Sequence, residues 1–136
     1  MWTAEQLRAI NEDGNLLVSA AAGAGKTAVM TERIARIIAS GTDVSEILVV
    51  TFTNPAAAEM KQRIERRLSE LAESTDDTKL KMHLHDSAIN ISTANISTIH
   101  SFCGNVLRRN CHIVGLDPAF LSLIHISEPT RLLSIS

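Results

Sequence analysis

Aromatic side chains are scarce in this sequence of 136 residues: they make up 3% of it, and tyrosine is absent. Aliphatic side chains must therefore fill whatever core the chain builds. The two cysteines, Cys103 and Cys111, are too few for the disulfide framework that holds many small secreted proteins together. These shortages favour a domain that folds by aliphatic packing in a reducing compartment.

An excess of one charge and long apolar runs are also missing. The formal net charge is −2, so any basic surface for nucleic acid must be local. No stretch approaches the roughly 18 apolar residues of a membrane span. The opening segment MWTAEQLRAI carries Glu5, where a signal peptide would be apolar. We therefore expect a soluble cytoplasmic protein without a membrane partner.

The stretch LLVSAAAGAGKT, residues 16–27, contains the most informative pattern. Its apolar run at 16–18 predicts a buried strand, its small residues at 19–25 predict a loop, and Lys26 and Thr27 open a helix. Gly23 and Gly25 can adopt backbone angles that are closed to other residues. Successive N–H groups of the loop can therefore point at one anion, and the helix N-terminus adds partial positive charge at the same place.

This strand–loop–helix predicts a site for the phosphates of a nucleoside triphosphate. Lys26 would reach the β- and γ-phosphates and the Thr27 hydroxyl would ligate Mg²⁺, which makes these two the candidate catalytic residues. The usual pattern begins with glycine, and alanine stands in that position here. The candidate nucleotide-binding residues are Ala20, Ala21, Ala22, Gly23, Ala24, Gly25, Lys26 and Thr27. The alternative is a small-residue loop that merely precedes a helix.

Hydrophobic periodicity predicts that helices and strands alternate along the chain. Thr3 and Gln6 have the spacing of a capping box, and Asn54 followed by Pro55 marks the N-terminus of a later helix. The expected helices cover about 4–10, 26–40, 54–72, 78–88 and 99–110, and the expected strands cover 16–18, 47–52 and 94–98. This alternation predicts an α/β fold, a parallel sheet of about three strands with right-handed crossovers and flanking helices.

Small polar residues follow the second and third expected strands, at Thr51–Asn54 and Thr98–Ser101. Ligands of α/β proteins bind outside the carboxyl ends of strands, and these side chains suit contacts to a phosphodiester backbone. Each segment taken alone is better explained by helix capping. Gln6 could pair with the edge of adenine, although an isolated glutamine is usually solvated.

Two clusters of titratable residues have a simpler structural explanation than a functional one. His83 and His85 are two positions apart and so do not share a helix face, and no second ligand pair stands at a zinc-finger spacing. The basic residues at 61, 63, 66 and 67 alternate with glutamates. That alternation predicts a solvated helix face with ion pairs between residues four apart.

The cysteines are not predicted to be reactive. Cys103 belongs to an apolar stripe with helical spacing, which predicts that it is a small buried core residue. The stripe consists of Ile99, Phe102, Cys103 and Val106. Cys111 receives no role from the sequence.

Four segments taken together resemble a known family: WTAEQLRAI, SAAAGAGKTAVMTERIARII, ILVVTFTNPAAAEMKQRIERRL and ISTIHSFCGNVLRR. They are similar to the opening part of UvrD-type superfamily-1 DNA helicases, and within these to the AddA type of helicase/nuclease. The resemblance covers Trp2–Phe120. It implies the first part of a RecA-like P-loop NTPase domain, truncated after about three strands.

The resemblance also implies roles for individual residues. Gln6 matches the glutamine that reads adenine, and residues 20–27 match the loop that binds ATP with Mg²⁺. The segments implied to contact single-stranded DNA contribute Thr51, Phe52, Thr53 and Asn54, and then Thr98, His100, Ser101 and Phe102. The implied partners are single- or double-stranded DNA and a second helicase/nuclease subunit of the AddB type.

Two features depart from the family pattern. Pro55 stands where relatives usually carry a small or basic residue, so a contact from that N–H is lost. The tail Leu121–Ser136 fits no helical stripe and resembles a translated sequencing-adaptor read-through. We therefore expect residues 1–120 to form the ATP-binding part of a domain and residues 121–136 to be unrelated to it.

The resemblance implies an ATP-dependent DNA helicase and exonuclease subunit of double-strand-break recombinational repair. Hydrolysis in such enzymes needs a second carboxylate at Mg²⁺, a water-orienting residue and an arginine finger, and no acidic pair follows Ser101. We therefore expect this chain to be inactive alone. The alternatives are a small P-loop kinase, which would need a basic lid, and a non-catalytic nucleotide-binding module.

Overall fold

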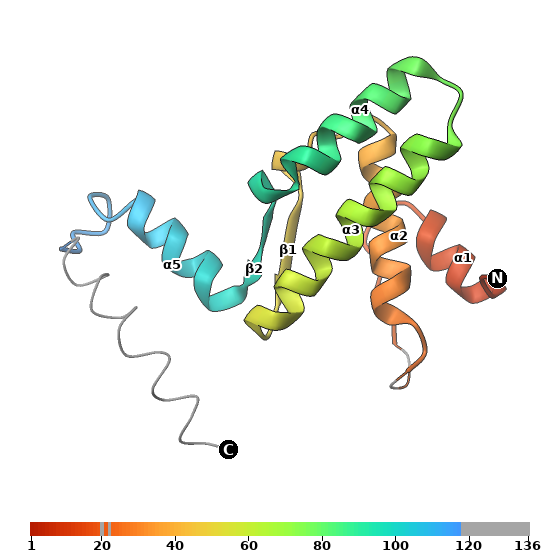
Figure 1. The fold of residues 1–136 in the computed structure, drawn as a ribbon. Coiled ribbons are helices and arrows are strands. Elements are labelled where there is room, and N and C mark those ends of the chain that lie inside the picture. The colour runs from red at the N-terminus through yellow and green to blue at the C-terminus, as the bar shows by residue number, and fades with distance from the viewer. Residues whose placement is uncertain (20, 22, 118–136) are drawn as a thin grey trace. The chain divides into compact units, whose positions relative to one another are not determined.

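The computed structural model describes residues 1–19, 21 and 23–117, so the predicted tail at 121–136 lies outside the described residues. Five α-helices, two 3₁₀ helices and two strands make up this part of the chain (Figure 1). In order they are α1 (Ala4–Asn11), α2 (Lys26–Ala39), η1 (Val44–Glu46), β1 (Leu48–Thr51), α3 (Asn54–Ser74), α4 (Thr78–Ile89), η2 (Asn90–Thr93), β2 (Asn95–Thr98) and α5 (Ile99–Arg109).

The chain divides into two compact units, Met1–Ser97 and Thr98–Ser136. In the first unit β1 pairs with β2 in a parallel two-stranded sheet, and α3 and α4 form the crossover between the two strands (Figure 1). The Asn95 N–H donates to the Ile47 carbonyl at 3.2 Å and so begins the pairing. This arrangement confirms the predicted α/β class.

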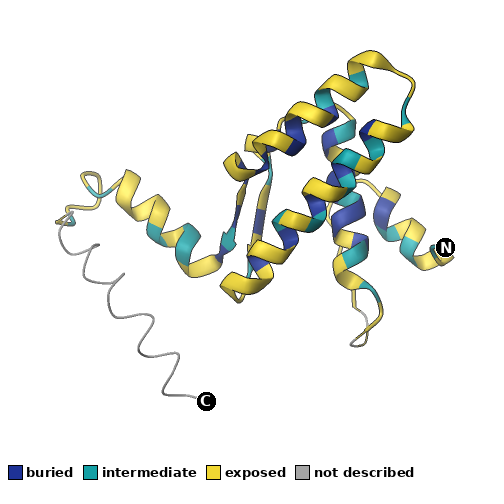
Figure 2. Ribbon diagram, viewed as in Figure 1, coloured by how far each residue is buried: buried dark blue, intermediate teal, exposed yellow. Residues whose placement is uncertain are grey.

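The core of the first unit is aliphatic, as the shortage of aromatic residues requires (Figure 2). The predicted stripes of α2 and α3 supply much of it, because every third or fourth residue of a helix lies on the same face. The largest fully buried side chains are Ile38, Ile64, Leu68 and Leu84. The last of these comes from α4, which the sequence predicted only weakly.

Side chains cap four of the five described α-helices, which explains where those helices begin. In α1, Thr3 and Gln6 form the predicted capping box. The N-cap of α3 is Thr53, whose Oγ1 accepts from the Ala56 N–H at 3.3 Å, so the prediction of Asn54 as the cap was wrong by one residue. Asn54 already has helical geometry, which places Pro55 in the first turn, where its missing N–H costs nothing.

The predicted strand at Leu16–Val18 is absent from the described structure. These residues carry no strand assignment, and Leu17 is 95% exposed. A strand exists only when a neighbour takes its backbone N–H and C=O groups, and within the described residues β1 and β2 pair with each other alone. The apolar run is therefore an extended, unpaired segment that leads into the glycine loop.

The apolar stripe of α5, in the second unit, does not form a core among the described residues. None of the side chains of α5 is buried, and Cys103 is exposed, so the prediction of Cys103 as a core residue was wrong. The helical spacing itself is confirmed, because α5 covers Ile99–Arg109. Across the described part of the chain, no helix combines the length and apolarity that crossing a membrane requires.

Candidate nucleotide-binding site

Two glycines give the loop before α2 its shape. Gly23 and Gly25 have φ angles of 80° and 78°, in the left-handed region that side chains disfavour. The Ala24 N–H donates to the Ala21 carbonyl at 3.2 Å and closes a tight turn between them. Ala20 and Ala22, which were predicted to take part in nucleotide binding, lie outside the described residues.

The loop delivers the chain to a helix start that no side chain caps. Gly25 is the N-cap of α2 and makes no side-chain cap hydrogen bond, whereas α1, α3, α4 and α5 each have a side-chain cap. The first N–H groups of a helix need an acceptor and carry partial positive charge. A phosphate group fits this position, because it can accept from them.

The side chains of Lys26 and Thr27 are placed as a phosphate site needs them. Lys26 Nζ donates to the Ala21 carbonyl at 3.2 Å, so the ammonium group lies over the loop rather than away from it. Both residues are exposed and therefore accessible to a ligand. An ammonium over a glycine loop and a hydroxyl in the first helical turn fit the triphosphate and Mg²⁺ of a nucleotide.

Gln6 lies next to this loop, although the two are far apart in sequence. Its Nε2 donates to the Ala24 carbonyl at 3.3 Å, while its Oε1 accepts from the Thr3 N–H at 2.9 Å. A Cβ on Gly25 would lie 3.2 Å from Gln6 Nε2, so only glycine permits this approach without displacement. The structure therefore joins the predicted adenine-reading residue to the predicted phosphate loop.

Arg33 holds α1 against α2 and was not predicted from the sequence. Its Nη1 donates to the carbonyl groups of Ala9 at 2.8 Å and Glu12 at 2.6 Å, and its Nη2 donates to that of Gly14 at 3.5 Å. Backbone carbonyl acceptors leave no mark in the sequence, so no motif could have revealed these bonds. The consequence for the site is that α1, which carries Gln6, is fastened to the helix that carries the phosphate loop.

A cavity of about 370 Å³ lies between α1, the segment before the loop and α2. Its lining combines residues already placed at the site with apolar side chains: Thr3, Glu5, Gln6, Ala9, Val18, Ser19, Ala24, Lys26 and Val29. An adjoining hollow of about 400 Å³ is lined in part by Leu16, Thr27 and Met30. Volumes in this range fit small-molecule ligands.

The predicted DNA-contacting residues of the first unit lie where β1 ends and α3 begins. Thr51 Oγ1 donates to the Thr53 carbonyl at 2.9 Å and shapes the turn between them. Phe52 is 96% exposed, although burial of an aromatic side chain is strongly favourable. An exposed aromatic ring beside polar residues offers a surface on which a base can stack.

The predicted residues of the second unit surround the start of α5. Thr98 Oγ1 donates to Ser101 Oγ at 2.9 Å and accepts from the Ser101 N–H at 3.2 Å, so it caps the helix. His100 is exposed and Phe102 is half-buried. Thr98 and Ser101 therefore have the capping role that the sequence offered as the simpler explanation.

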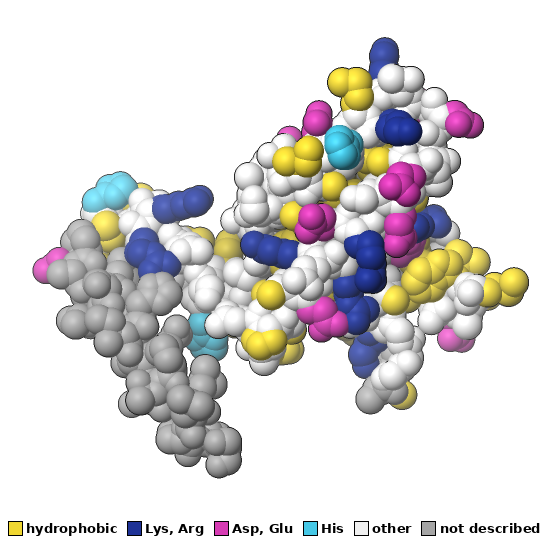
Figure 3. Space-filling model, in the orientation of Figure 1, with side chains coloured by type: hydrophobic (Ala, Val, Ile, Leu, Met, Phe, Trp, Pro, Cys, Tyr) yellow, Lys and Arg dark blue, Asp and Glu magenta, His cyan; other side chains and the backbone are white. Residues whose placement is uncertain are grey.

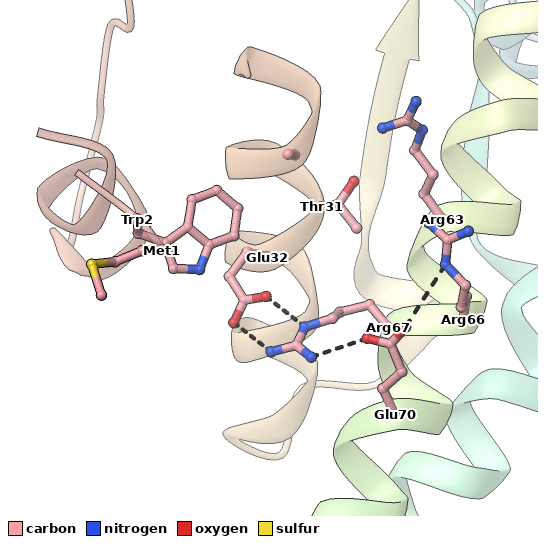
Figure 4. Close-up of a pocket in the computed structure, with 9 residues that line it drawn as sticks. Met1, Trp2, Thr31, Glu32, Arg63, Arg66, Arg67 and Glu70 are labelled. Atoms are coloured by element: carbon pink, nitrogen blue, oxygen red, sulfur yellow. Dashed lines mark hydrogen bonds and ion pairs between the residues drawn. The ribbon is translucent and has the colours of Figure 1, made fainter. Parts of the chain in front are cut away.

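The basic face of α3 forms ion pairs, as predicted, and its charges alternate in sign (Figure 3). Arg63 pairs with Glu59 at 2.5 Å and Arg66 with Glu70 at 3.8 Å, each four residues apart. Arg67 departs from the pattern because its main partner is Glu32 on α2 (Figure 4). The Arg67 guanidinium and, to a lesser extent, Arg36 hold the pKa of Glu32 below its ordinary value against the effect of burial.

His83 has a structural contact of its own. Its Nε2 lies 2.8 Å from the Ile38 carbonyl near the C-terminus of α2, and because a carbonyl only accepts, Nε2 carries the proton. Among the described residues, no group of three or more histidines, cysteines or acidic residues could hold a metal ion. His85 and Cys111 have no assigned role.

Comparison with known proteins places the chain in a defined group. Residues 2–133 match the family model of the UvrD/REP helicase N-terminal domain. The chain is 48% identical over 120 residues to the AddA-type ATP-dependent helicase/nuclease of Lactobacillus gasseri and 49% identical over 121 residues to that of Heliobacterium modesticaldum. These alignments cover 88% of this chain but only 10% and 8% of the relatives. A similar protein from Pediococcus pentosaceus is 43% identical over 131 residues, which is 96% of this chain and 10% of that relative.

Proposed function

Because the chain belongs to the family of UvrD/REP helicase N-terminal domains, we propose that it is the ATP-binding and single-stranded-DNA-contacting part of an ATP-dependent DNA helicase/nuclease. The names of its relatives describe one subunit of an ATP-dependent helicase/nuclease. We extend to this chain their ATP dependence, DNA as substrate, a partner that is a second subunit, and a cytoplasmic role in double-strand-break repair. Within this proposal residues 1–120 form the functional part, and residues 121–136 stay a prediction of unrelated sequence.

The observation that carries the proposal is the uncapped start of α2 behind two left-handed glycines. The loop amides and the first turn of α2 would donate to the β- and γ-phosphates, and Lys26 would add a compact positive charge. The Thr27 hydroxyl would ligate Mg²⁺, which neutralises charge on the phosphates when it is bound. Gln6, held at the loop by Ala24, would select adenine through its amide.

The proposed DNA contacts rest on a second observation, the exposure of Phe52. A base would stack on its ring, while hydroxyl and amide groups of Thr51, Thr53 and Asn54 would contact the phosphodiester backbone. The segment at Thr98–Phe102 would add further backbone contacts. Such contacts hold a strand without reading its sequence, as a motor that moves along DNA requires.

The proposal is tested by titrating the chain with a fluorescent ATP analogue and Mg²⁺. We expect Lys26→Ala to weaken binding at least tenfold, because one charged contact to phosphate is lost, whereas Lys81→Ala on the exposed surface of α4 serves as the control and should change it less than twofold. No turnover is expected from the chain alone. Equal binding by the wild type and the Lys26→Ala variant would contradict the assignment of the phosphate loop.

The DNA contacts are tested with a labelled single-stranded oligonucleotide and fluorescence anisotropy. Phe52→Ala should lower the affinity by roughly five- to tenfold, because a base–aromatic stack contributes about 1–3 kcal/mol. Ile89→Ala removes an exposed apolar side chain from α4, where 67% of the residue is exposed, and should leave the affinity unchanged. Equal losses in both variants would show that the effect is not specific to the end of β1.

A further inference from the structure

A buried carboxylate joins α2 to α3. Glu32 is 4% exposed, and its two oxygens accept from Arg67 Nε at 2.5 Å and from Arg67 Nη2 at 3.1 Å. Arg36 Nε adds a third bond at 3.3 Å, and Arg67 Nη1 donates to Glu70 at 3.1 Å. Figure 4 shows that the guanidinium of Arg67 reaches across from α3 to the Glu32 carboxylate on α2. The result is a forked, two-bond contact between residues 35 positions apart.

The residue before Glu32 makes a second connection to the same helix. Thr31 is also buried; its Oγ1 donates to the Thr27 carbonyl at 2.9 Å and lies 3.7 Å from Met60 Sδ on α3. Thr27 belongs to the first turn of α2. Two successive buried polar residues of α2 therefore contact α3, and one of them also bonds to the turn that would bind Mg²⁺ and phosphate.

Stability alone is a poor explanation for the buried charges. Removing two charges from water costs about as much as their attraction returns, and apolar residues in the same place are often equally or more stabilising. The two helices already contribute apolar residues to one core, among them Ile38, Ile64 and Leu68. What a planar arginine–carboxylate fork adds is direction, because its two parallel bonds fix how one helix is rotated against the other.

The two helices begin at the two proposed binding segments. The helix α2 starts at the phosphate loop, and Glu32 lies about 9 Å further along its axis at a rise of about 1.5 Å per residue. The helix α3 starts at Asn54, directly after Phe52 and Thr53. A shift of α2 caused by a bound triphosphate would reach the DNA segment only if α2 and α3 moved together.

We propose that Glu32 is a positioning residue whose fork to Arg67 makes α2 and α3 one rigid body, so that nucleotide at the phosphate loop changes the affinity of the Thr51–Asn54 segment for single-stranded DNA. The inference rests on the proposed function, since it needs ATP at one helix and DNA at the other. Glu32 touches neither ligand. Its effect appears as a coupling between two affinities and not in either affinity alone.

The test measures the Kd of a labelled oligothymidine for the chain with and without a non-hydrolysable ATP analogue and Mg²⁺. The ratio of the two values is the coupling factor, expected to be about fivefold or more in the wild type. The double variant Glu32→Met with Arg67→Met removes both charges, leaves the net charge unchanged and keeps the site apolar. We expect it to melt near the wild-type temperature and to bind each ligand alone within twofold, with a coupling factor within twofold of one.

The matched control is the double variant Glu59→Met with Arg63→Met, which removes an exposed pair from α3 and should keep the wild-type coupling factor. If the double variant at Glu32 and Arg67 does not fold, Arg67→Lys decides, because it keeps the charge and loses the fork; its coupling factor should fall at least twofold.

Three results would overturn the inference. A wild-type coupling factor of one, with both ligands bound, or a wild-type factor retained without the fork would refute it while leaving the proposed function intact. A wild-type chain that does not bind the ATP analogue would refute the proposed function and the inference with it.

Discussion

Glu32 shows how one side chain can make stability depend on pH. Arg67 lowers its pKa in the folded chain, so the folded state holds the proton less tightly than the unfolded state does. A carboxylate of this kind stabilises the fold above its unfolded pKa, and this contribution disappears as the pH falls through the lower, folded pKa. The charged form of Glu32 is therefore part of the stable structure near neutral pH.

The corresponding prediction compares the wild type with Glu32→Gln by urea unfolding between pH 7 and pH 3. The wild type should have the larger free energy of unfolding at pH 7, and the difference should shrink as the pH falls below about 4.5, where the unfolded carboxyl group binds its proton. Asp43, whose pKa is also lowered, is present in both proteins and cancels. A difference that stays constant or grows in acid would contradict this account of Glu32.

At the residue scale, the sequence revealed local roles and missed distant ones. The capping box of Thr3 and Gln6 was predictable because both partners are neighbours in the chain. The fork between Glu32 and Arg67 was not, because its residues lie on different helices and each also has a plausible partner nearby. Gln6 could be named but not placed, since only the fold brings its amide to Ala24.

At the scale of elements, the beginning of α3 gives a direct test of a corrected prediction. Thr53→Ala removes the hydroxyl that accepts from the Ala56 N–H and should lower the free energy of unfolding by about 1 kcal/mol. Asn54→Ala, which changes a residue already inside the helix, should cost only a few tenths. Chemical denaturation of both variants measures this, and a larger loss in Asn54→Ala would show that Asn54 is the cap after all.

The helices were predictable from periodicity and the first strand was not. Ile34 and Ile38, like Ile64 and Leu68, are buried at helical spacing, and a helix satisfies its own backbone wherever it lies. The run at Leu16–Val18 has the composition of a buried strand, but a strand depends on a neighbour that local sequence cannot specify. For the same reason the apolar stripe of α5 predicted a helix correctly and its burial wrongly.

At the scale of the whole molecule, much apolar surface is exposed on the described residues. Leu17 and Phe52 are almost fully exposed, and Leu48 and Val50 of β1 are about half exposed. Two short strands bury little surface, so the chain should be only marginally stable. We predict a broad thermal transition, binding of a hydrophobic dye at room temperature, and a rise in the transition temperature when ATP and Mg²⁺ are added.

Circular dichroism with and without nucleotide measures this prediction, with Lys26→Ala as the control that should not respond to the ligand. A sharp transition at high temperature without ligand would contradict the claim of marginal stability. An equal response to nucleotide in the Lys26→Ala variant would show that the ligand acts elsewhere.

The central claim, that the loop before α2 binds a nucleoside triphosphate, is tested most directly by amide NMR of ¹⁵N-labelled chain in the cold. Addition of ATP and Mg²⁺ should shift the amide signals of residues 23–27 most strongly, together with the side-chain amide of Gln6, because these N–H groups would acquire the ligand as an acceptor. Unchanged signals at these residues, or shifts confined to other parts of the chain, would contradict it.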